Sequence, residues 1–182
     1  MTKDSLIRNY GDYQNLYVYQ KADVIYQLTY YYCETYMDRI HDRTVDQMIQ
    51  SARSTKQNIA EGCTDFSTSM KMGIQLVNVA KGSLKELRED FEDRLKTQGK
   101  KMWEKDSEEV KTMRKIAKTQ NDAAYYMDIA RTRPPETIAN MVLCLIAQTD
   151  YLLNKLLEKM SDEFENSGGF SERMYNWRTK KQ

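Results

Sequence analysis

The chain has 182 residues, with 28 basic and 27 acidic side chains, a formal net charge of +1 and 40% hydrophobic residues. The hydrophobic share is high enough to form a core, so the composition excludes a globally disordered protein. The balance of charges excludes a protein that is basic over its whole surface. Nucleic-acid binding would therefore need a local basic patch, or the repetition of such a patch in an oligomer.

The composition favours long helices over strands. Only 7 Gly and 2 Pro interrupt a chain that is rich in good helix formers. No apolar run reaches the roughly 18–20 residues that span a bilayer. The first residues also lack the basic-then-apolar pattern of a signal peptide. We therefore expect a cytoplasmic protein without a membrane partner.

The residues that bind metals or act as nucleophiles are sparse. Cys33, Cys63 and Cys144 are far apart and odd in number, which argues against a disulfide framework. His41, the only histidine, is interpreted as a loop residue between the first two helices, because zinc and di-iron sites need more ligands. Phosphate-binding loops, dinucleotide-binding turns and nucleophile elbows are also absent from the sequence. We expect no metal, no cofactor and no catalytic residue.

The first helix is predicted from about residue 13 to 37, where apolar residues recur at helical spacing. Most of the 13 tyrosines lie in or just before it. These rings could form a stacking platform for bases. We favour the alternative that they widen a seam between helices. The expected buried face comprises Val18, Ala22, Val24, Ile25, Leu28, Thr29, Tyr32 and Tyr36.

The second helix is expected to begin at a capping box, with Thr44 as the N-cap and Gln47 reaching back to it. It should end near Gly62, because glycine is common just after a helix. A short loop, 63–67, then leads to a third helix over about 69–97. The third helix should pack as in a bundle, through residues alternately three and four apart: Val77, Ala80, Leu84, Leu87, Phe91 and Leu95.

Residues 100–132 are polar and rich in lysine, and we interpret them as a helical excursion that is solvated on most sides. A last long helix restarts at the two prolines, Pro134 and Pro135, which the first turn of a helix tolerates. The predicted fold is therefore all-α: an antiparallel up-down four-helix bundle over 13–165 that contains the excursion, and a C-terminal extension over 166–182.

Two motifs, taken together and in this order, resemble a known family. The first runs from Gln47 and Met48 through Ser54 to the segment 58–62, and the second covers 79–87. They resemble the 23S rRNA-intervening-sequence proteins, over about 13–95 and again over 136–164. Segments 42–48 and 168–172 resemble a longer subgroup with a C-terminal "suffix" extension. One departure is that Ile49 and Gln50 stand where the family has a pair of arginines.

The resemblance implies four antiparallel helices that assemble into a homo-oligomeric ring, commonly a pentamer. Related bundles are accessory proteins of diversity-generating retroelements, where they bind RNA and a reverse transcriptase. The family as a whole has no settled biochemical activity. RNA or DNA, and a protein such as a reverse transcriptase, are therefore the expected partners.

The motif residues are expected to have structural roles. A carboxylate at a helix C-terminus, as expected for Glu61, is disfavoured by roughly 0.3–1 kcal/mol. We therefore predict that Glu61 and Asn58 form bonds to the third helix, near Ser83 or a basic side chain. A general base at Glu61 is the alternative, but it lacks a partner acid, histidine or metal. A mid-helix glycine costs about 1 kcal/mol, so a second helix should approach Gly82 closely. The structural set is Asn58, Glu61, Gly62, Gly82, Ser83 and Glu86.

Lys81, Lys85 and Arg88 recur at i, i+4 and i+7 and form a basic stripe on the third helix. Such a stripe is either a solvated face or a phosphate-binding surface that a ring would multiply. Interspersed glutamates weaken its field. Further candidates for nucleic-acid contact are Arg53 and Lys56 in the second helix and Arg173 and Arg178 in the tail, which could equally dock on the bundle.

Three functions are compatible with the sequence. The first is a non-enzymatic, oligomeric accessory or chaperone that binds nucleic acid or a nucleic-acid enzyme. The second is a protein-interaction scaffold that uses the tyrosine-rich first helix and the tail. The third, an enzyme, has no supporting constellation of residues.

Overall fold

The structure is a computed structural model that describes residues 12–167 and Thr179. A short 3₁₀ turn, η1 (Tyr13–Asn15), precedes six α-helices in the described residues, and no strand occurs among them. Arg173 and Arg178, with most of the expected C-terminal extension, lie outside the described part of the chain. The division into a bundle over 13–165 and an extension over 166–182 stays a prediction.

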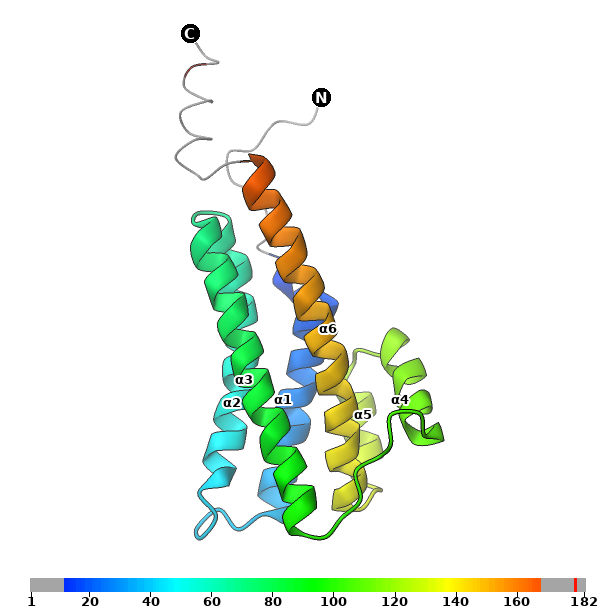
Figure 1. Cartoon of the computed structure of the whole chain (residues 1–182). Helices are drawn as coiled ribbons and strands as arrows, with labels where there is room; N and C mark the ends of the chain where they lie inside the picture. The colour runs from blue at the N-terminus through cyan, green and yellow to red at the C-terminus, as the bar shows by residue number, and fades with distance from the viewer. Residues whose placement is uncertain (1–11, 168–178, 180–182) are drawn as a thin grey trace.

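Four long helices form the bundle (Figure 1). They are α1 (Tyr17–Tyr36), α2 (Thr44–Phe66), α3 (Met70–Thr97) and α6 (Pro135–Ser167). Helices α1 and α3 each pack against both α2 and α6, and successive bundle helices run in opposite directions. The antiparallel up-down four-helix bundle is therefore confirmed.

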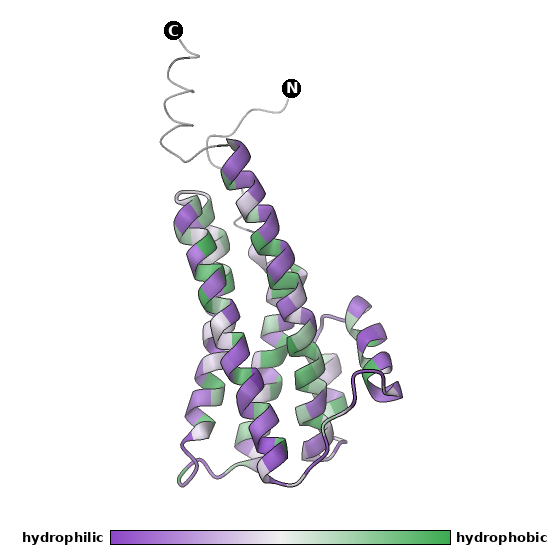
Figure 2. Cartoon of the chain, in the orientation of Figure 1, coloured by the Kyte–Doolittle hydropathy of each residue, from purple (hydrophilic) through white to green (hydrophobic). Residues whose placement is uncertain are grey.

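The core follows the predicted seams. All six expected residues of α3 are fully buried, as are Ile138, Val142 and Leu145 in α6. Helix α3 ends two residues before Gly99, whose φ of +63° is the left-handed conformation that glycine adopts readily. Hydrophobic residues gather on the half of α6 nearest α5 (Figure 2). The favoured interpretation of the tyrosines holds for Tyr32, which is buried with its ring 5.3 Å from that of Phe91.

The excursion contains two helices, α4 (Glu108–Thr119) and α5 (Ala123–Ala130). The excursion is exposed on most sides, as expected, and one face of it packs on the bundle, because α5 contacts α1 and α4 contacts α6. Tyr126 is fully buried, and its hydroxyl donates a 3.0 Å hydrogen bond to the Gln120 carbonyl oxygen. The same carbonyl accepts from the ammonium group of Lys21, which is buried in α1. These contacts tie the excursion to the bundle.

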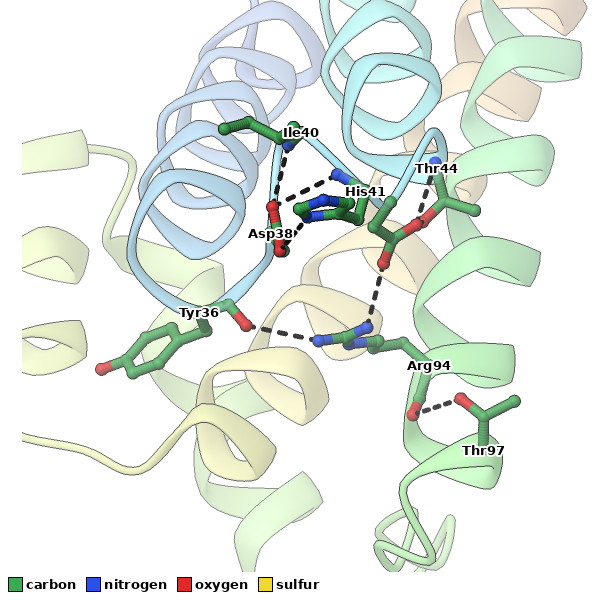
Figure 3. A network of polar contacts seen from close by, with 8 residues as sticks. Tyr36, Asp38, Ile40, His41, Thr44, Arg94 and Thr97 are labelled. Carbon is green, nitrogen blue, oxygen red and sulfur yellow. Dashed lines mark hydrogen bonds and ion pairs between the residues drawn. The ribbon is translucent and has the colours of Figure 1, made fainter.

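The start of α2 differs from the expected capping box. Thr44 is already helical, and the Asp42 carboxylate accepts a 3.1 Å hydrogen bond from its backbone N–H. The Thr44 hydroxyl lowers the pKa of Asp42, although partial burial opposes it. Arg94 of α3 lies 3.2 Å from the same carboxylate and also donates to the Tyr36 carbonyl oxygen (Figure 3). Arg94, near the end of α3, therefore holds the Asp42 side chain close to the end of α1 and the start of α2, where Asp42 caps α2.

The end of α2 also differs from the expectation. The helix does not stop near Gly62 but continues to Phe66, which is buried. A Cβ on Gly62 would lie 2.8 Å from Val77 Cγ2 and 3.0 Å from the Gly73 carbonyl oxygen. Gly62 therefore lets α2 and α3 approach, and it does not terminate a helix. Ile59, Cys63 and Phe66 continue the buried stripe through the glycine.

Candidate nucleic-acid interface

A cavity of about 710 Å³ lies where α3, α4, α6 and the connection before α4 meet. Its floor is largely apolar and includes Leu143, Cys144 and Ala147 of α6 with Val110 of α4. Two aromatic residues line it: Trp103 from the connection, and Tyr151 of α6, which is 61% exposed. The cavity thus combines an apolar floor with ring surfaces of the kind on which planar ligands stack.

Four cations line this cavity: Arg88, Lys105, Arg114 and Lys118. Arg88 is held by Glu92, at 2.7 Å. The side chains of the other three form no ion pair or hydrogen bond within residues 12–167, whereas the neighbouring Lys111 pairs with Glu108. The positive charge beside the floor is therefore largely uncompensated.

The connection that carries Trp103 is fixed to α6 by Asn140, which is buried. Asn140 Oδ1 accepts a 2.8 Å hydrogen bond from the Trp103 backbone N–H. Its Nδ2 donates to the carbonyl oxygens of Lys101 at 3.0 Å and of Glu136 at 2.8 Å. All the polar atoms of this buried amide are used, so Asn140 positions one wall of the cavity.

The predicted basic stripe lies beside this cavity. Lys81, Lys85 and Arg88 all line a second cavity, of about 540 Å³, between α3 and α6. Arg88 and Ala147 line both cavities, so the two are adjacent, and we call the pair the α3–α6 groove. Lys81 is partly engaged, because its Nζ donates to Asn154 Oδ1 at 2.5 Å and lies 4.0 Å from Asp150. Lys85 is exposed and lies 3.8 Å from Glu89.

The structure does not bring Arg53 and Lys56 to this groove. Lys56 Nζ forms a 2.9 Å ion pair with Asp23 of α1 and lies 4.6 Å from the centre of the Tyr26 ring. It therefore stabilises the packing of α1 on α2, on the other side of the bundle from α6. Arg53 is exposed on α2 and does not line either cavity. The expected extension of the stripe from α2 is wrong.

The motif residues divide into those that link helices and those that do not. Asn58 donates to the Ser54 hydroxyl at 3.1 Å, and this hydroxyl lies 3.0 Å from that of Ser83. Asn58 thus reaches α3 through Ser54, close to the expectation. Glu86 accepts from Ser51 at 3.4 Å.

Glu61 and Gly82 differ from their expected roles. Glu61 is exposed, five residues before the end of α2, and makes no hydrogen bond or ion pair in the described part of the chain, so its expected bond to α3 is wrong. Gly82 is exposed, and a Cβ there would meet nothing within 4 Å. Among the described residues, no other helix comes within 4 Å of a Cβ at this position, so the expected close packing is not found there.

The titratable groups of the groove have no arrangement typical of a catalytic site. Burial raises the pKa of the Cys144 thiol to about 11, although Arg114 opposes the shift.

His41 is an exposed loop residue whose Nδ1 lies 2.7 Å from an Asp38 carboxylate oxygen, as Figure 3 shows. In residues 12–167 and 179, no three His, Cys, Asp or Glu side chains are grouped so that they could hold a metal ion.

Sequence reasoning missed Lys105, Arg114, Lys118, Trp103 and Tyr151. Arg114 and Lys118 are four residues apart, the same spacing that identified Lys81 and Lys85, so a signal was present. This spacing was not taken as a sign of a binding surface, because residues 100–132 were expected to be a solvated excursion. That α4 folds back onto α6 could not be inferred from periodicity alone.

The family model of the 23S rRNA-intervening sequence proteins matches residues 14–116 of the chain. The protein belongs to this family. The match covers α1, α2, α3 and most of α4, and thus one side of the α3–α6 groove. Comparison with curated proteins and with solved structures found no significant match. Within the described residues of this family member, every helix is too short or too polar to cross a bilayer.

Proposed function

We propose that this member of the 23S rRNA-intervening sequence protein family is a non-enzymatic accessory or chaperone that binds RNA or DNA along the α3–α6 groove. The observation that carries the proposal is a set of three cations, Lys105, Arg114 and Lys118, that have no ion pair among residues 12–167 and lie beside an aromatic-lined floor. The family name, which refers to an rRNA sequence, supports nucleic acid over other anionic ligands.

Unpaired cations are the ones that favour phosphate binding. A cation that is free in the unbound protein can contact a phosphate without the loss of an ion pair, and each contact releases counterions from the nucleic acid. Lys105, Arg114 and Lys118 are all exposed and line the same cavity. The affinity for nucleic acid should therefore fall steeply as the salt concentration is raised.

The proposal is tested by fluorescence anisotropy with a structured RNA and a duplex DNA, at about 50 and 200 mM salt. The double variant Arg114→Glu, Lys118→Glu should lose most of the binding and lower the magnitude of the salt slope by about 1.4–1.8, the value for two phosphate contacts. The matched control is Lys111→Glu with Arg131→Glu, the same charge change at side chains that pair with neighbouring acids. Equal losses in both double variants would remove the groove from the proposal.

We also infer that the protein self-associates, as the ring expected from the family resemblance requires. Met72, Val79 and Gly82 lie on one face of α3; Met72 is 47% and Val79 51% exposed. Exposed apolar residues beside a glycine let a second helix approach closely. A homo-oligomer, with a pentamer as the specific expectation, should be measured by light scattering at micromolar concentration. A monomeric mass would contradict this inference.

The second candidate function is a protein-interaction scaffold. The exposed rings of Tyr17 and Tyr30 on α1 favour it, because tyrosine is enriched in protein interfaces. A reverse transcriptase is one partner that the family resemblance suggests. This function would replace the first if the protein bound no nucleic acid at either salt concentration while a purified partner protein bound to it.

A further inference from the structure

We propose that the larger cavity of the α3–α6 groove binds a short unpaired stretch of a nucleic-acid strand, with a base stacked on Tyr151 and phosphates beside the cations of α4. This inference rests on the proposed function and specifies the form of nucleic acid that the groove accepts.

The apolar floor of the larger cavity suits an unpaired base. The cavity is concave and its floor includes the apolar side chains of Val110, Leu143 and Ala147. A duplex presents its charged backbone outward and keeps the faces of its bases stacked inside, so it cannot cover such a floor. An unpaired base has two free π-faces that stack on aromatic side chains and cover apolar surface.

The part of the larger cavity that α6 lines is long. Trp103 is held at Asn140, which precedes Tyr151 by 11 residues on the same helix, so the two ends of the cavity are about 16 Å apart along α6. Stacked bases are about 3.4 Å apart. This length spans several such spacings, so the cavity fits several nucleotides better than one.

The cations beside the larger cavity belong to more than one segment of the chain. Arg114 and Lys118 are one turn apart on α4, and Lys105 lies in the connection that precedes this helix. The adjacent second cavity, which Arg88 also lines, adds Lys85 to these cations. A strand can follow this path and contact cations along it, whereas a free mononucleotide, which has the same chemistry, would occupy only one part.

The experiment compares three ligands of the full-length protein: a short oligouridine, a blunt RNA duplex of the same length and uridine monophosphate. Binding is measured by anisotropy for the two labelled RNAs, and by competition for the mononucleotide. The variant Tyr151→Leu removes the ring and keeps an apolar side chain. The matched control is Tyr17→Leu, because Tyr17 is 62% exposed but does not line the groove.

We expect the oligouridine to bind most tightly, and Tyr151→Leu to weaken its binding by roughly 5- to 100-fold, the range for loss of one stacked base. The salt slope should not change, since no phosphate contact is lost, and Tyr17→Leu should bind as the wild type does. The inference is overturned if the duplex or the mononucleotide binds as tightly, or if Tyr151→Leu has no effect.

The same data separate this inference from the proposed function. Equal, salt-sensitive binding of oligouridine and duplex that is lost in Arg114→Glu, Lys118→Glu would keep the nucleic-acid function and reject the unpaired-strand site. Absence of binding to all three ligands would reject both.

Discussion

Gly62 of α2 and Gly73 of α3 face each other across a close backbone contact between the two helices. A Cβ on Gly73 would lie 2.7 Å from the Gly62 carbonyl oxygen and 2.8 Å from the Phe66 Cα atom. These are backbone atoms of a buried helix, so they cannot move aside as the end of a flexible side chain can. The two glycines set the distance between α2 and α3.

Gly73→Ala is therefore expected to destabilise the protein. Overpacking of this kind costs about 1–3 kcal/mol, and for a chain of this size each kcal/mol lowers Tm by about 2–4 °C. Thermal unfolding followed by circular dichroism measures the change. An unchanged Tm would mean that α2 and α3 separate more easily than their contact indicates.

Gly82→Ala, on the same helix, is expected to stabilise the protein. Alanine is favoured over glycine within a helix by about 1 kcal/mol, and a Cβ at position 82 meets nothing within 4 Å. The variant should raise Tm in the same assay. A lower Tm, or a smaller mass by light scattering, would show that a second copy of the chain approaches this glycine.

Lys21→Met should change how stability depends on pH. Burial lowers the pKa of Lys21 to about 8, from an ordinary value of 10.5. Between these values the unfolded chain binds a proton that the folded protein does not, so wild-type stability should rise with pH across this window. Methionine has no titratable group, so the variant should lack this pH dependence. In the variant, the Gln120 carbonyl oxygen still accepts a hydrogen bond from the Tyr126 hydroxyl.

Urea unfolding of both proteins at pH 7, 8 and 9, all below the range in which most tyrosines titrate, measures the effect. The stability of the wild type should increase relative to the variant from pH 8 to pH 9. Parallel pH profiles would mean that Lys21 keeps its ordinary pKa, with its hydrogen bond to Gln120 offsetting burial.

Glu61→Ala should leave stability within about 0.5 kcal/mol of the wild type, the range for surface substitutions. Glu61 is exposed and unpaired in the described part of the chain. Denaturant midpoints of the two proteins check this. If the variant instead lost self-association or RNA binding at unchanged stability, Glu61 would contact a partner.

Periodicity predicted the helices and most of the core, because buried positions such as Leu84, Leu87 and Phe91 repeat with the helical turn. Periodicity could not decide the role of a single residue whose type is compatible with two different structures. A glycine such as Gly62 marks either a helix end or a close contact, and only the position of α3 decides between them. Lys21 lies among apolar neighbours, but its acceptor, Gln120, is 99 residues away.

The candidate site was harder to predict than the fold for the same reason. Lys81, Lys85 and Arg88 could be found because they share one helix. Trp103, Arg114 and Tyr151 belong to three different segments, and only the docking of α4 on α6 brings them to one cavity. The ion pair of Lys56 with Asp23, which takes Lys56 out of the candidate site, is likewise a contact between distant segments.

The floor and the unpaired cations of the larger cavity come from different parts of the chain. Most of the floor belongs to α6, within the bundle, whereas Lys105, Arg114 and Lys118 all belong to the segment between α3 and α5. Met113 and Ala117 of the same segment belong to the core, so its buried face must be kept while its exposed cations can be exchanged. Ligand preference in this architecture can therefore change through a few surface positions of α4 and the connection before it, and replacement of Lys105, Arg114 and Lys118 alone is a direct route to altered binding.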